Sequence, residues 1–275
     1  MKWHADSVSQ IGSTHLTRFI PNQDYALNNS SDSGNVFALA LDGCSSGGET
    51  DIGARVMAKN LEKALLAAER IDPEVIINSQ QGCLDIAREL RLDRSDLLAT
   101  RLVAWANHDN SLGFHVTGGG VVAIRYFDGS LLLKRFSWSN NTPYYWIYGD
   151  TEREFFAADS EIGWLKIEVF SVGAEGDICL VSEEEHKGKA ALCYTQVFSP
   201  DEATDVQALA VMSDGVEQIQ EQSWQDVAVS LLNCRTWRGE FIRRRLRSVL
   251  RQYKKGGFEP LDDISVAVIT ATENS

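Results

Sequence analysis

Short runs of apolar residues, bounded by Gly, Asn, Asp and Ser, dominate the hydrophobic pattern of the chain and predict a protein rich in β-strands. Residues 25–27 and 36–41 flank the turn-forming sequence NNSSDSGN, which predicts a β-hairpin with a long loop. The apolar segments between residues 97 and 138 are separated by the turn signals HDNS and DGS, so they predict an antiparallel meander. Further strands are expected at residues 167–172, 177–181, 208–212 and 264–271.

Helical periodicity appears between these runs. Residues 51–69 have apolar positions near helical spacing, and Pro73 opens a second helix that is expected to continue to about Leu92. Two more helices are expected at residues 223–233 and 239–253. Strands in series with paired helices favour an α+β fold in which helices cover two antiparallel sheets.

The region 138–164 is rich in Trp, Tyr and Phe but follows neither a strand nor a helix period. We expect it to be either a partly ordered flap or insertion, or aromatic packing against the core. No linker, repeat or low-complexity tract divides the chain, so we expect one domain over residues 1–275.

The charge composition of the chain disfavours some classes of binding partner. The 275 residues include 26 Lys and Arg against 39 Asp and Glu, a formal charge of −13, which disfavours binding to nucleic acid or to an anionic membrane surface. The N-terminus does not resemble a secretory signal, and no apolar run approaches the roughly 18 residues of a membrane span. The five cysteines are scattered and form no CxxC pair. These features favour a reduced, cytoplasmic protein, which we expect to be a monomer.

Aspartates stand at the ends of four predicted strands. Asp42 and Asp214 each follow a strand and precede a glycine, whereas Asp24 and the pair Asp262-Asp263 each precede a strand. Antiparallel pairing within the predicted hairpin brings Asp24 near Asp42, and the same arrangement can bring Asp262 near Asp214. Carboxylates gathered at one sheet edge repel one another unless a cation lies among them. Oxygen ligands without His or Cys suit Mg²⁺ or Mn²⁺, although any single Asp-Gly pair would be an ordinary turn.

Five short motifs follow one another in a specific order. They are Asn22-Gln23-Asp24, Asp42-Gly43 with Gly47-Gly48, Gly118-Gly119-Gly120, Ser213-Asp214-Gly215 and Asp262-Asp263-Ile264-Ser265. Their order and spacing resemble the metal-dependent type 2C protein phosphatases in their bacterial form, over about residues 10–270. The opening Gly12-Ser13-Thr14-His15 is most similar to a divergent bacterial branch of that family.

This resemblance implies a four-layer α/β/β/α sandwich with a binuclear metal site at one end of the central sheets. By the family pattern, Asp42 would bridge both ions, and Asp214 and Asp262 would hold the first. The Gly43 carbonyl would help to hold the second ion, and Asp24 would act through metal-bound water.

The implied activity is that of a serine/threonine phosphoprotein phosphatase that uses two Mn²⁺ or Mg²⁺ ions. A hydroxide held between the ions would attack phosphorus in line, and no phosphoenzyme is required. The partners would be a phosphorylated protein substrate and an opposing kinase. Asp42, Asp214 and Asp262 are the residues whose loss should abolish activity. Asp262 takes the ligand position in the family alignment, although Asp263 could also serve.

Three positions depart from the family pattern. Phe19 stands where an arginine usually holds the phosphate, which leaves Arg18 or His15 as the phosphate-binding cation. Cys44 stands where animal members carry a histidine proposed as general acid. Gly119 replaces the acid of a Gly-Asp motif that binds a third metal in bacterial members, so we expect that site to be weakened or absent. A catalytically weak or silent signalling module on the same scaffold is therefore the alternative function.

Two other features have competing interpretations. The segment Gly43-Cys44-Ser45-Ser46-Gly47 fits the GxSxG turn of a serine hydrolase. That fold needs a parallel sheet and a downstream acid and histidine, so a hydrolase using Ser45 is a remote alternative. The basic run at residues 243–255 predicts a cationic helix face, which is either a solvated surface or a site for an acidic partner or phosphoprotein segment.

Overall fold

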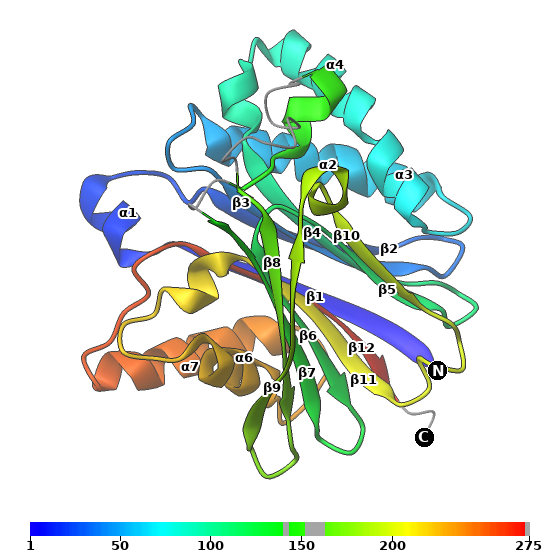
Figure 1. The fold of residues 1–275 in the computed structure, drawn as a ribbon, viewed down its shortest axis with the longest axis vertical. Helices are drawn as coiled ribbons and strands as arrows, with labels where there is room; N and C mark the ends of the chain where they lie inside the picture. The colour runs from blue at the N-terminus through cyan, green and yellow to red at the C-terminus, as the bar shows by residue number, and fades with distance from the viewer. Residues whose placement is uncertain (140–142, 152–162, 273–275) are drawn as a thin grey trace.

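A computed structural model describes residues 1–139, 143–151 and 163–272 of the chain. Two antiparallel β-sheets pack face to face, and helices cover the outer side of each sheet (Figure 1). The seven-stranded sheet has the order β1 (Lys2–Gln10), β12 (Ile264–Thr272), β11 (Val206–Met212), β6 (Gly120–Tyr126), β7 (Leu131–Trp138), β8 (Leu165–Val172) and β9 (Ile178–His186). The five-stranded sheet has the order β10 (Tyr194–Phe198), β5 (Leu112–Thr117), β4 (Ala99–Ala106), β3 (Val36–Gly43) and β2 (Asp24–Ser30).

The helices complete a four-layer α/β/β/α arrangement, which confirms the predicted fold class. The five-stranded sheet is covered by α2 (Thr50–Ala67), α3 (Pro73–Asn78) and α4 (Gln80–Leu90), and the seven-stranded sheet by α6 (Trp224–Leu232) and α7 (Phe241–Lys255) (Figure 1). The short helix α1 (Ser13–Arg18) connects β1 to β2. Short 3-10 helices lie at Arg94–Leu97, Trp146–Thr151, Gly188–Ala191 and Asp214–Glu217.

Strand alternation explains how the layers pack. On β3, Phe37, Leu39 and Leu41 point into the apolar layer beneath α2, α3 and α4. Ala38 and Ala40 point the other way, into the layer between the two sheets. Because successive side chains on a strand face opposite sides, one apolar run supplies two cores at once, with the larger side chains on the helix side.

The expected meander is wrong in one respect, because the apolar segment at 112–127 is two strands rather than one. β5 belongs to the five-stranded sheet and β6 to the seven-stranded sheet. The chain crosses between them at Gly118 and Gly120, whose φ angles are +93° and +137°. A Cβ on Gly120 would approach Met212 O to 2.6 Å, so the crossing requires glycine.

Other boundaries also differ from the predictions. The helix expected from Pro73 to about Leu92 is broken at Ser79, whose carbonyl accepts a hydrogen bond from Asn60 Nδ2 at 2.5 Å. The sequence patterns also did not predict β1, β10 or α1, which are short or mixed in polarity. Across the described parts of the chain, no helix combines the length and apolar character that crossing a bilayer requires.

The aromatic region predicted at 138–164 lies partly outside the described residues. Within the part that is described, Tyr145, Trp146 and Ile147 join the apolar layer under the helices of the five-stranded sheet. The Trp146 indole N–H donates to Met57 Sδ, and Trp146 O accepts from Gln80 Nε2 at 2.8 Å. This stretch therefore leaves β7 of one sheet and packs against the helical layer of the other.

Candidate metal centre

The first pair of predicted acids is brought together by a local hairpin. β2 and β3 pair antiparallel in a register that places Asp24 directly opposite Asp42. The hairpin expected from the sequence is therefore confirmed, with longer strands and a shorter loop than the apolar runs indicated.

The second pair lies at the neighbouring strand ends of the other sheet. Met212 pairs with Val266 across β11 and β12, and Ser213 N donates to Ser265 O at 3.0 Å. Asp214 follows this point on one strand, and Asp262 precedes it on the other. The two pairs are joined across the sheets by Ser213, whose Oγ donates to Asp24 Oδ2 at 2.6 Å.

These strand ends surround a cavity of about 720 Å³ between the two sheets. Its walls combine acids, backbone turns, two cations and an aromatic segment. The lining residues are His15, Gln23, Asp42, Gly43, Cys44, Ser45, Ser46, Thr100, Gly119, Arg135, Phe136, Ser137, Trp138, Pro143, Tyr145, Asp214, Glu217, Gln218, Asp262 and Asp263.

The acids of this cavity are held in unfavourable electrostatic surroundings. The pKa of Asp24 is raised to about 8, mainly by burial and then by the charges of Asp214 and Asp263, against the opposing hydrogen bond from Ser213. Burial, followed by the charges of Asp214 and Asp24, also raises the pKa of Asp42 well above its usual value. The pKa of Asp214 is raised by burial and by Asp262. Such clustered carboxylates are stabilised when a cation lies among them.

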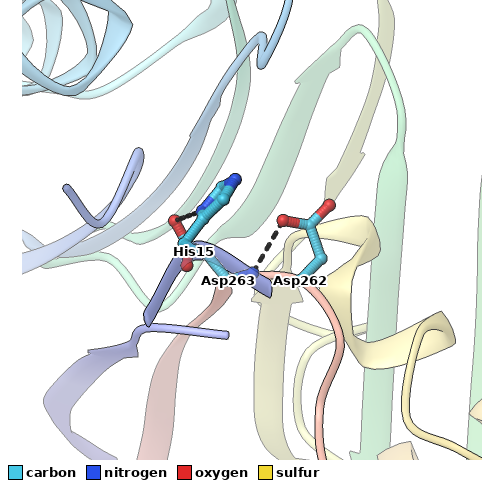
Figure 2. A group of neighbouring side chains, drawn as sticks. All are labelled: His15, Asp262 and Asp263. Atoms are coloured by element: carbon cyan, nitrogen blue, oxygen red, sulfur yellow. Dashed lines mark hydrogen bonds and ion pairs between the residues drawn. The ribbon is translucent and has the colours of Figure 1, made fainter. Parts of the chain in front are cut away.

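Asp262 and Asp263 are adjacent in sequence but have different surroundings (Figure 2). Asp263 is buried, and its two carboxylate oxygens accept hydrogen bonds from Gly12 N at 2.7 Å and Gln23 N at 2.6 Å. Asp262 is less buried; its Oδ1 accepts from Asp263 N at 2.8 Å and its Oδ2 accepts from Gln218 Nε2 at 3.0 Å. Because Asp263 has a third contact, from His15, Asp262 has more capacity left for a cation, whereas Asp263 ties the chain before α1 to the chain before β2.

His15 extends this acidic group. Its Nδ1 lies 2.9 Å from Asp263 Oδ2, and the side chain is buried where α1 borders the cavity (Figure 2). One ligand atom from each of His15, Asp262 and Asp263 can be chosen so that all three lie within 4.8 Å of one another. His15 is thus a cation or a nitrogen donor at the edge of the site.

Arg18 lies elsewhere. Arg18 is the last residue of the short helix α1. Arg18 is exposed and does not line the cavity, and Phe19, at the position of the family arginine, is 95% exposed. Of the two cations considered from the sequence, the structure brings only His15 to the acids.

Arg135 on β7 is a cation of the cavity that the sequence patterns did not indicate. Its guanidinium bridges Glu168, at 3.1 Å, and Glu217, at 2.6 Å, and its charge acts on Asp214. Burial opposes the charged form of Arg135, but its two glutamates outweigh this and raise its pKa. In the sequence, the only sign of this role was that Arg135 is a charged residue inside an apolar strand segment.

Two of the three departures from the family pattern, Gly119 and Cys44, lie in the cavity wall. Gly119 is the turn between the two sheets, and a Cβ built on it would have Phe136 O as its nearest neighbour, at 3.3 Å. Burial raises the pKa of the Cys44 thiol, but hydrogen bonds from Ser46 and Tyr145 leave it lowered overall.

The structure contradicts the serine hydrolase alternative. Ser45 is exposed, and every strand pairing of both sheets is antiparallel, whereas a serine hydrolase needs a parallel sheet.

Two cavity oxygens lack a hydrogen-bond partner within the described residues. They are Gln23 Oε1 and Thr100 Oγ1, and both are buried. Together with the carboxylates beside them, these oxygens give the centre of the cavity metal-binding atoms that are all oxygen, with no nitrogen or sulfur among them. Such a set fits a hard divalent cation such as Mg²⁺ or Mn²⁺.

Comparison with known proteins agrees with this architecture. The sequence profile described as Protein phosphatase 2C matches residues 11–251. No curated protein sequence matches the chain. The S. agalactiae serine/threonine phosphatase is 14% identical, with a TM-score of 0.54 over 98% of this chain and 100% of that chain.

Two further structures share the arrangement of sheets and helices. The serine/threonine phosphatase Stp1 from Staphylococcus aureus is 9% identical, with a TM-score of 0.56 over 99% of this chain and 96% of that chain. The PP2C phosphatase domain of the cell fate determinant SpoIIE from Bacillus subtilis, solved with a fragment of its regulatory domain, is 14% identical, with a TM-score of 0.55 over 99% of this chain and 65% of that chain. At these identities the likeness establishes the fold.

Proposed function

Because the chain belongs to the protein phosphatase 2C family, we propose that it is a metal-dependent phosphatase of phosphoserine and phosphothreonine in proteins. The observation that carries this proposal is that Asp42 from one sheet and Asp214 and Asp262 from the strand ends of the other line a single cavity, with Asp24 paired opposite Asp42. The substrate would be a phosphoprotein produced by an opposing kinase.

We assign the metal ligands to the acids that line the cavity. Asp42 would bridge two ions, Asp214 and Asp262 would hold the first, and the Gly43 carbonyl would help to hold the second. Asp24 is buried behind Asp42 and would act through water. When bound, Mg²⁺ or Mn²⁺ would activate water as a nucleophile and neutralise the phosphoryl oxygens. Gly119 offers no carboxylate, so two ions are proposed.

The remaining residues would bind and orient the phosphomonoester. His15, held by Asp263, presents its ring at the cavity wall, where it would bind a phosphoryl oxygen in place of the family arginine. Arg135 is held rigidly by Glu168 and Glu217 and would supply a second positive charge beside Asp214. Catalysis of this kind depends mainly on positioning and charge, which a cavity with fixed side chains provides.

The test is hydrolysis of p-nitrophenyl phosphate and of a phosphothreonine peptide with Mn²⁺, with Mg²⁺ and with excess chelator. Metal-dependent turnover that is lost in Asp214→Asn, with the fold retained by circular dichroism, is the expected result. Full turnover by Asp214→Asn would contradict the ligand assignment. No turnover by the parent protein, with two metals still bound per chain, would instead establish a silent phosphatase-like module.

A further inference from the structure

The basic helix α7 forms one wall of a groove next to the candidate metal centre. Its sequence FIRRRLRSVLRQYKK carries seven Lys and Arg residues, while Phe241, Ile242, Leu246 and Val249 are buried against the seven-stranded sheet. The apolar face is thus covered, and the cationic face is left exposed. This arrangement is unusual in a chain whose formal charge is −13.

The opposite wall of the groove is α1. The groove has a volume of about 310 Å³ and combines apolar and cationic groups. Its lining includes Leu16 from α1, Leu250 and Arg247 from α7, and Phe258 and Pro260 from the segment that follows α7. Arg251 and Lys254 add two further cations, and Glu259 is the only acid in this lining.

Exposed apolar side chains extend this surface around α1. Leu16 is 57% exposed, Phe19 is 95% exposed and Leu261 is 41% exposed. Phe19 follows Leu16 by three residues, which is close to one helical turn, and it ends α1 with a φ of +58°. Large apolar side chains grouped beside cations on an exposed surface are typical of sites that bind a protein segment.

The same two chain segments form the groove and the metal centre. Ser13 N donates to Pro260 O at 2.8 Å, and Thr14 N donates to Leu261 O at 3.1 Å, so α1 is tied to the segment before Asp262. On α1, His15 lines the cavity, whereas its neighbour Leu16 lines the groove. Figure 1 shows α1 and the end of α7 at the same side of the molecule, with the chain after α7 running up to α1.

We propose that the groove between α1 and α7 docks an acidic segment of the phosphoprotein substrate, with an apolar residue of that segment seated among Leu16, Leu250 and Phe258. This proposal rests on the proposed phosphatase function and identifies the substrate feature that the enzyme selects. Arg247 and Arg251 are positioned to pair with carboxylates of such a segment, whereas Lys254 Nζ already lies 3.3 Å from Glu259 Oε1. A nucleic acid or an anionic membrane would meet the same cations, but the formal charge of −13 repels these extended polyanions more than it repels a short peptide.

The distance between the groove and the candidate metal centre determines how long a peptide must be to reach both. A helix with its side chains is about 10 Å across, and an extended chain covers about 3.3 Å per residue. A segment reaching around α1 therefore needs about three to six residues between the phosphothreonine and the docked residues. We would use phosphothreonine peptides with such a spacer and a Glu-Asp-Leu-Glu extension on either side, and matched peptides with Lys in place of Glu and Asp.

The experiment measures binding and turnover separately. Anisotropy of the labelled, unphosphorylated acidic peptide is measured on protein in chelator, and kcat/KM is measured on the phosphopeptides with metal. The groove variant Arg247→Glu/Arg251→Glu is compared with Arg244→Glu/Lys255→Glu, which makes the same change in charge on exposed residues of α7 outside the groove. Leu16→Ser tests the apolar contact at an exposed position, where no core packing is lost.

We expect the groove variant and Leu16→Ser to weaken acidic-peptide binding about tenfold, and to lower kcat/KM on the extended phosphopeptide while p-nitrophenyl phosphate turnover is unchanged. Equal effects of the two double variants, or no preference for the acidic over the lysine peptide, would overturn the docking site. Preferential binding of a single-stranded oligonucleotide or of phosphatidylglycerol vesicles to the groove would also overturn it. If p-nitrophenyl phosphate is not hydrolysed at all, the proposed function fails, whereas peptide anisotropy still decides the groove.

Discussion

Ser213 Oγ donates a 2.6 Å hydrogen bond to Asp24 Oδ2, and this bond joins the edge of one sheet to the strand end of the other. The same Oγ accepts from Ser265 N at 2.9 Å, so one buried hydroxyl satisfies two groups. Asp24 is 2% exposed and has little access to water as a replacement. Ser213 is therefore a link between the two halves of the candidate metal centre.

We expect Ser213→Ala to destabilise the protein. It leaves Asp24 and Ser265 N without this partner, and each unsatisfied buried group costs about 1–3 kcal/mol. The melting temperature should fall by several degrees. Ser265→Ala is the matched control, because Ser265 Oγ is buried and has no hydrogen-bond partner among the described residues. Equal losses in the two variants, measured by thermal denaturation, would contradict the role of Ser213.

The stability of the metal-free protein should fall as the pH rises from about 4 to about 8. Burial raises the pKa of Asp24 to about 8, so the folded state retains a proton that the unfolded chain releases near its usual pKa of about 4. Above the folded pKa, the full cost of the buried charge is present. Thermal denaturation in chelator between pH 5.5 and 8.5 measures this trend.

Added metal should oppose the trend, because Mn²⁺ or Mg²⁺ binds the ionised carboxylates and stabilises the folded state. The gain in melting temperature on adding Mn²⁺ should therefore increase with pH over the same range. Asp24→Asn is expected to reduce the slope of the chelator curve, since it removes one of the buried carboxyl groups whose pKa is raised. A metal-free melting temperature that rises steadily from pH 5.5 to 8.5 would disprove this account.

Asparagine substitutions at the two adjacent aspartates should have different effects. Asp262→Asn is expected to weaken metal binding at least about tenfold, because it removes a proposed ligand charge. Asp263→Asn should leave the metal stoichiometry unchanged but lower the melting temperature, since an amide nitrogen would face Gly12 N or Gln23 N. It should also raise KM for the phosphorylated substrate, because His15 loses its charged partner. Calorimetric metal titration and thermal denaturation together separate the two roles, and loss of metal only in Asp263→Asn would reverse the assignment.

A carboxylate introduced at Gly119 should create an additional metal ligand. The built Cβ lies 3.3 Å from Phe136 O, so a side chain fits after a shift of a few tenths of an ångström. We expect Gly119→Asp to increase the number of Mn²⁺ ions bound per chain in a calorimetric titration and to lower the metal-free melting temperature. Gly119→Ala adds the same Cβ without the charge. An unchanged stoichiometry in Gly119→Asp would show that this turn cannot present a ligand.

Ser45→Ala tests the remaining alternative chemistry. Ser45 is exposed at the cavity wall, and we assign it no part in binding or catalysis. Turnover of p-nitrophenyl phosphate by this variant should stay within about twofold of the parent and should remain sensitive to chelator. Loss of activity together with indifference to chelator would support a serine nucleophile instead.

Much of the fold follows from local patterns. The alternation in residues 36–41 and the turn residues before it predict the hairpin, and the hairpin alone brings Asp24 opposite Asp42. The segment at 112–127 was predicted less well, because apolar periodicity does not say to which sheet a strand belongs. That choice depends on the positive φ angles of Gly118 and Gly120, which direct the chain from one sheet to the other.

The sequence by itself determined the strand and helix pattern, the kind of chemistry available and the family to which the chain belongs. Only the tertiary structure decided which of two adjacent aspartates is left available to a cation, because amides of Gly12 and Gln23, far away in the chain, occupy Asp263. It also decided that His15 rather than Arg18 reaches the cavity, and that Arg135 lies there. A step of one residue changes the direction of a side chain, and the contacts that select that direction come from segments distant in sequence.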